Sequence, residues 1–141
     1  METERPTEFP GPRVGAGVSV FARRHTLKAM LTVSVAGEQH TLSEPASRVL
    51  RKSFRAVAEG VAYEKLCNLG ILSGPLECHD RVISVSRRGL VQVVTLSMRI
   101  AEGNLDYCKR QWEEAIADWA RAVGATFVGL EGAIHAEVST D

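Results

Sequence analysis

The densest cluster of reactive side chains in the sequence is Glu77-Cys78-His79-Asp80. A thiol and an imidazole together are the pair that nucleophilic catalysis uses. Neighbouring residues of a strand point to opposite faces, however, so this order does not bring Cys78 and His79 together. We therefore interpret the segment as the polar start of a strand. With no catalytic residues predicted, the chain is expected not to be an enzyme.

Metal and cofactor sites are not indicated by the sequence either. The three cysteines and four histidines include no Cys-x-x-Cys or His-x-x-x-His pair, so no set of zinc ligands has usable spacing. Gly11, Gly15 and Gly17 are irregularly spaced and follow no strand, so they do not form a phosphate loop. We expect neither a metal nor a cofactor.

Cations are the chemical feature that recurs along the chain. Two Arg-Arg pairs are expected at hairpin turns, and further cations fall on one side of a helix. Arginine dominates this set, which favours bidentate contacts to phosphate over mere solubility. The candidate phosphate-binding residues are Arg23, Arg24, Arg48, Arg51, Lys52, Arg55, Arg87 and Arg88.

These cations predict a non-enzymatic nucleic-acid-binding protein that grips the phosphate backbone of RNA or DNA. The aromatic residues near them are only Phe21 and Phe54, so duplex shape is favoured over stacking on single strands. The alternative is a small regulatory or adaptor protein that binds or inhibits another protein. Such a protein would use its acidic C-terminal part, a Trp-bearing helix or an open sheet edge.

Charge is distributed unevenly, although the net charge is zero. Residues 13–99 carry a surplus of seven positive charges, whereas residues 1–12 and 100–141 carry surpluses of two and five negative charges. This asymmetry indicates either a surface for nucleic acid or another acidic partner, or an acidic end that folds over the basic middle.

The length of 141 residues, 45% of them hydrophobic, is typical of one domain. Residues 1–15 are rich in proline and glycine and are predicted to be a flexible tail, followed by a single domain at 16–141. We find no apolar run long enough to cross a membrane and no basic secretory signal. The three widely spaced cysteines suit a reducing compartment, so a cytoplasmic protein without a membrane partner is expected.

Alternating apolar residues predict five strands, at residues 17–22, 27–35, 81–86, 90–100 and 126–138. The first two are expected to turn at 23–26, and the next two at 87–89, where Gly89 tolerates a positive φ. On the last strand, Glu131, His135 and Glu137 share a side that is interpreted as an exposed polar face.

Two amphipathic helices are predicted between these strands. Ser43 is expected to cap the first, which carries its apolar residues opposite its cations and ends between residues 68 and 75. The second is expected over residues 105–123, stopped by Gly124. Trp112 and Trp119 fall on its apolar face and are interpreted as core residues.

The order ββαββαβ predicts a two-layer α+β fold, in which a mainly antiparallel sheet carries both helices on one face. The strand pattern of residues 18–59 resembles that of 83–123, which indicates an internal ββα duplication, or only the alternation common to half-buried strands. A homodimer is also expected, because the closing strand is long and alternating and the chain pairs a basic middle with an acidic end. Its twofold interface would bury either an edge strand or the Trp-bearing helix face.

Overall fold

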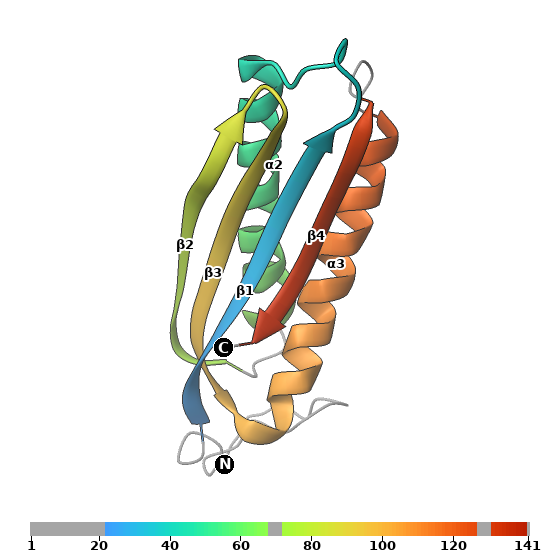
Figure 1. Ribbon diagram of the computed structural model, residues 1–141. Helices are drawn as coiled ribbons and strands as arrows, with labels where there is room; N and C mark the ends of the chain where they lie inside the picture. Colours follow the sequence, from blue (N-terminus) through green and yellow to red (C-terminus); the bar gives the residue numbers. More distant parts are fainter. Residues whose placement is uncertain (1–21, 68–71, 127–130, 141) are drawn as a thin grey trace, which may run out of the picture.

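The computed structural model, which describes residues 22–67, 72–126 and 131–140, contains one antiparallel four-stranded sheet (Figure 1). Its strands are β1 (Ala22–Val35), β2 (Leu72–Ser86), β3 (Gly89–Ala101) and β4 (Gly132–Thr140). They lie in the order β2-β3-β1-β4. Two long helices, α2 (Glu44–Val61) and α3 (Leu105–Thr126), cover the same face of the sheet. The predicted two-layer α+β class is confirmed.

The described elements follow one another as β1, α2, β2, β3, α3 and β4, with a π-helix at Ala62–Cys67 and a 3-10 turn at Glu102–Asn104. This β-α-β-β-α-β order is the ferredoxin-like arrangement of two βαβ halves. Each half pairs its strands antiparallel with those of the other half, and β1 and β3 form the centre of the sheet. A duplication as the origin of the two halves stays a prediction.

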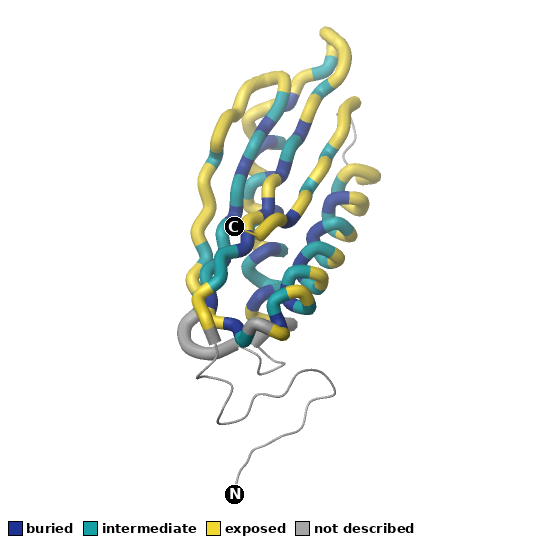
Figure 2. Tube along the Cα trace, turned by 60° about the horizontal axis from the view of Figure 1, so that its bottom comes forward, coloured by how far each residue is buried: buried dark blue, intermediate teal, exposed yellow. Residues whose placement is uncertain are grey.

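The core lies between the two central strands and the helices, as Figure 2 shows. Alternate residues of β1 from Leu27 to Val33 are at most 2% exposed, and β3 alternates in the same way from Leu90 to Ile100. The helices contribute residues at helical spacing, namely Leu50, Phe54 and Ala58 of α2 and Cys108, Trp112 and Ile116 of α3. Within the described ranges, no helix or strand covers the other face of the sheet, as the sequence predicts.

Local sequence signals fix the start of α2 and the second hairpin. The Ser43 hydroxyl accepts a hydrogen bond from the Ala46 amide at 3.2 Å, and proline stands in the first turn, so the predicted cap is confirmed. Strands β2 and β3 meet at Ser86 and Gly89, which confirms the turn predicted at 87–89, although Gly89 does not have a positive φ. Trp112 is fully buried, and Trp119 packs against the core, as expected.

The turn predicted at residues 23–26 is wrong. These residues belong to β1, which pairs with β3 without interruption from Ala22 to Ser34. The polar sequence looks like a turn, but a long partner strand satisfies its backbone and makes it part of the sheet. The strand predicted at 17–22, apart from Ala22, and the tail predicted at 1–15 lie outside the described residues.

The boundaries near the end of the chain also differ from expectation. Helix α3 continues past Gly124 to Thr126, because one glycine in a last turn costs only about 1 kcal/mol. The Thr126 hydroxyl also donates to the Ala122 carbonyl at 3.1 Å. Strand β4 begins only at Gly132, where a Cβ would lie 1.9 Å from the Ser34 carbonyl oxygen. Glycine is therefore required for β4 to approach β1 at this point.

Phe54 is the residue through which the contact between the two helices is best tested. Its side chain is fully buried, and its ring lies 5.4 Å from that of Trp119 on α3. Phe54→Ala leaves a cavity there and is expected to lower the free energy of unfolding by about 3–5 kcal/mol in urea titrations. As the control, Val49→Ala on the 58% exposed side of α2 should change it by less than about 0.5 kcal/mol. Equal effects of the two substitutions would contradict this packing.

Candidate functional site

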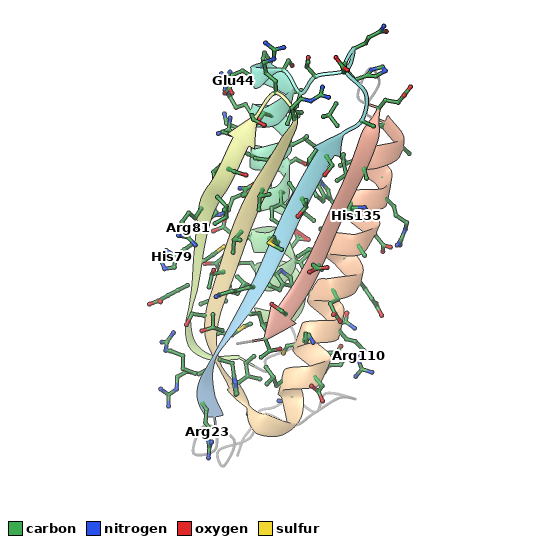
Figure 3. The ribbon with its side chains drawn as sticks, in the orientation of Figure 1. Arg23, Glu44, His79, Arg81, Arg110 and His135 are labelled. Carbon is green, nitrogen blue, oxygen red and sulfur yellow. The ribbon has the colours of Figure 1, made fainter. Side chains whose placement is uncertain are left out.

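The two Arg-Arg pairs lie at opposite ends of the sheet. Arg24 pairs with Arg99 in the register of β1 and β3, whereas Arg88 accepts a backbone hydrogen bond from Val35 at the far end of β1. From Arg24 to Val35 the strand rises by about 36 Å, at about 3.3 Å per residue. In Figure 3, Arg23 accordingly lies at the end opposite Glu44, the first residue of α2. This distance exceeds a Debye length of about 10 Å, so the charges of the two pairs do not add.

All four arginines are exposed, but within each pair one of them also makes side-chain contacts in the domain. Arg24 donates to the Ser97 hydroxyl at 2.7 Å and lies 3.9 Å from a Glu77 carboxylate oxygen. Arg88 donates to the His40 carbonyl at 2.8 Å. Arg23 and Arg87 are exposed. The two pairs thus do not form one surface with the helix, because Arg87 and Arg88 lie beside the residues that precede α2, whereas Arg23 and Arg24 lie at the far end of β1.

The four predicted helix cations do lie together, along one wall of a hollow between α2 and β2. We call this hollow the α2–β2 pocket; its volume is about 370 Å³. Its lining residues are Arg48, Arg51, Lys52, Arg55, Ala56, Glu59, Asp80, Val82 and Gln92.

Arg55 ties the helix to the edge strand at the base of this pocket. Its guanidinium forms an ion pair with Asp80, donates to the Cys78 carbonyl at 3.2 Å and reaches Glu59 at 3.4 Å. Burial acts to lower the pKa of Arg55, but the hydrogen bonds to Glu59 and Asp80 and the attraction to nearby negative groups outweigh it, so the pKa is raised. The side chain is therefore a permanent cation whose hydrogen bonds are directed into the fold.

Gln92 of β3 forms the polar floor of the pocket and is only 1% exposed. Its Nε2 donates to the Arg51 carbonyl and to the Asp80 carboxylate, both at 3.3 Å. Its Oε1 has no hydrogen-bond partner within the part of the chain that the structure describes. Sequence reasoning missed Gln92, Asp80 and Glu59. The available signal was Gln92 itself, a polar residue at an inward position of β3, whose other inward residues are apolar.

The Glu77-Cys78-His79-Asp80 segment lies within β2 and does not join its thiol to its imidazole. Cys78 pairs with the buried Leu96, and His79 pairs with Thr95 on the uncovered face, so the two side chains point in opposite directions, as expected. Burial is the largest influence on the thiol and raises the pKa of Cys78, with Arg55 opposing it and two carboxylates adding to it. A thiol with a raised pKa stays protonated near neutral pH and is a poor nucleophile.

Thiol chemistry gives a direct measurement of this environment. At about pH 8.5, where an ordinary thiol is half ionised, alkylation of Cys78 by iodoacetamide should be slower than that of a free cysteine peptide and should rise with pH. Cys108 should react more slowly still, because burial raises its pKa to about 12. Peptide mass spectrometry measures both rates, and the unfolded chain, in which the two thiols become equivalent, is the control. A Cys78 rate equal to that of the free peptide would refute this account.

Neither a family nor a curated relative identifies the chain: no known protein family matches the sequence, and no curated protein does. Solved structures of similar fold include a hydantoinase/carbamoylase family amidase from Burkholderia ambifaria, with a TM-score of 0.48 and 13% identity over 87% of this chain. An amidase of the same family from Burkholderia multivorans has a TM-score of 0.46 and 9% identity over 86% of this chain. The chain spans only 29% and 28% of their respective lengths.

The predicted nucleic-acid-binding function is wrong. The solved structures of similar fold are described as amidases and not as nucleic-acid-binding proteins. The physical reason is the placement of the cations, since the Arg-Arg pairs lie far apart and several arginines are bound to carboxylates and carbonyls of the same chain.

Two further properties concern only the described residues. They bring together no group of three or more His, Cys, Asp or Glu side chains that could hold a metal ion. Neither α2 nor α3 combines the length and the apolar character that crossing a membrane requires.

Proposed function

We propose that this domain self-associates as a homodimer through the free edge of β4. The observation that supports the proposal is that β4 is a regular edge strand whose sequence is complementary to itself. Strands β2 and β4 are the two edges of the sheet, and unpaired backbone groups at an edge are able to pair with another chain.

The two edges differ in regularity. Strand β2 has register shifts between Ser73 and Glu77 and between Val82 and Ser84, and such irregularities hinder the addition of another strand. Strand β4 pairs with β1 in an unbroken register from Gly132 to Thr140. The geometry therefore favours β4 as the edge that pairs.

The direction of the backbone groups in β4 follows from two hydrogen bonds. The Val35 amide donates to β3 through the Arg88 carbonyl at 3.0 Å, and the next amide, of Ala36, donates to the Glu131 carbonyl at 2.7 Å. Because backbone groups alternate along a strand, odd-numbered residues of β4 turn their N–H and C=O to β1, and even-numbered residues turn them outward. Ile134, Ala136 and Val138 thus present donors and acceptors that no other described strand pairs.

A twofold axis at Ala136 makes two copies of β4 complementary. His135 then lies opposite Glu137 of the second copy on the uncovered face, and this pair occurs twice per dimer. Ile134 lies opposite Val138 on the face covered by helices, where both pack against the core of their own chain. Cross-strand pairs of opposite charge or of apolar residues contribute about 0.2–1 kcal/mol each. Helix α3 runs along β4, so the two α3 helices would widen the interface (Figure 1).

A proline at position 136 tests the edge directly. Ala136→Pro removes an amide that points outward, and it leaves the ladder to β1 intact because proline is tolerated at the free side of an edge strand. Sedimentation equilibrium is expected to give the parent protein twice the 15.3 kDa mass of one chain, and the variant the mass of a monomer. The fluorescence of the buried Trp112 checks that the variant is folded. A monomeric parent at high micromolar concentration would refute the proposal.

A charge exchange tests the register. His135→Glu places like charges opposite each other twice and should weaken the dimer, whereas adding Glu137→His exchanges the two partners and should restore it. Both side chains are exposed, and Figure 3 shows His135 on β4, so folding is not affected. No recovery in the double variant would exclude the register centred on Ala136.

A further inference from the structure

We propose that the α2–β2 pocket binds a small organic polyanion, a di- or tricarboxylate, at a site separate from the β4 edge. The charge of the pocket wall, the buried polar groups of its floor and its size support this proposal. It is independent of the proposed self-association, since the pocket lies beside the other sheet edge, β2.

The wall of the pocket carries more positive charge than its surroundings neutralise. Cations four residues apart on a helix repel each other, and Arg48 and Lys52 stand at this spacing, whereas Arg55 is already paired with Asp80 and Glu59. Glu44 pairs with Arg51 at 2.9 Å and more loosely with Arg48 at 3.5 Å. No ion pair involves Lys52 among the residues that the structure describes. An anion bound between Arg48 and Lys52 would relieve this repulsion.

The floor of the pocket contains polar groups that the described residues leave unsatisfied. Gln92 is 1% exposed, and neither its Oε1 nor the buried Nε of Arg55 has a hydrogen-bond partner in the described ranges. Purely structural polar clusters normally satisfy their buried atoms. The Nε–H of Arg55 suits a ligand oxygen that accepts a hydrogen bond. The Oε1 of Gln92 suits a ligand hydroxyl group, or a water that bridges to the ligand.

The dimensions of the pocket favour several anionic groups over one. From Arg48 to Arg55 the helix rises by about 10 Å, at about 1.5 Å per residue, so a single oxyanion reaches only part of the wall. The volume of about 370 Å³ lies near the lower limit for small-molecule sites, which begins at roughly 300 Å³, so one small molecule fills it. Ala56 and Val82 supply apolar wall for a short carbon chain. The side chain of Arg48 is 56% exposed, so the site is open to solvent.

Calorimetric titration with citrate, succinate, acetate and inorganic phosphate at constant ionic strength tests this site. Citrate is expected to bind at one molecule per chain, and at least about tenfold more tightly than acetate or phosphate, because it makes at least one more charge-assisted contact. The double variant Arg48→Gln/Lys52→Gln should weaken citrate binding by at least about a further tenfold. Both side chains are exposed, so the fold should persist.

The matched control is Arg23→Gln/Arg110→Gln, which removes the same charge from two exposed arginines on β1 and α3 (Figure 3). It should leave citrate affinity unchanged within about twofold, since charges beyond a Debye length of ~10 Å are screened. If both double variants weaken citrate binding equally, the effect is that of net charge alone, and the proposed site is overturned. The absence of citrate binding by the parent protein would also overturn it. Phosphate binding as tight as citrate would overturn the polyanion assignment. Retained citrate binding by the Ala136→Pro variant separates this result from that of self-association.

Discussion

The antiparallel pairing of β1 with β3 is the constraint on which the rest of the structure depends. It runs without a shift from Ala22 opposite Ala101 to Ser34 opposite Gly89. A slip by one residue would turn every core side chain of a strand to the uncovered face, so the buried alternation on both strands holds the register. The same register turns Gln92 inward, toward the helices, and thereby places a polar group beneath the cations of α2.

Because the central strands fill the middle of the sheet, the two outer strands have different surroundings. Strand β2 is irregular, and its Asp80 is held by Arg55 from α2, so this edge is joined to the helix through polar contacts. Strand β4 is regular, and its covered side packs on the core through Ile134 and Val138. One edge is thus suited to enclosing a small polar molecule, and the other to adding a strand. Both properties follow from topology and not from any single motif.

Features fixed by neighbouring residues could be predicted from the sequence, and features fixed by distant pairing could not. The Ser43 cap and the turn before Gly89 depend on residues within one turn of chain, and both were predicted correctly. Residues 23–26 are strand only because β3, far along the chain, pairs with them. The pocket likewise joins Arg55 to Asp80 across separate elements, and periodicity within α2 carries no information about that partner. The inward position of Gln92 was the one visible sign of it.

The arginines of α2 show why charge along a sequence is a weak guide to function. On a helical wheel they form one basic face, on which each is equally available to a phosphate. In the fold, Arg55 is bound to a carboxylate and a carbonyl of β2, and Arg51 is bound to Glu44. Removing Arg55 would leave the part-buried Cys78 carbonyl and the Asp80 carboxylate without this donor, and that loss appears as instability. Arg48 and Lys52, at the exposed rim, can lose their charge at little cost to folding, so any binding by this face is measured through those two residues.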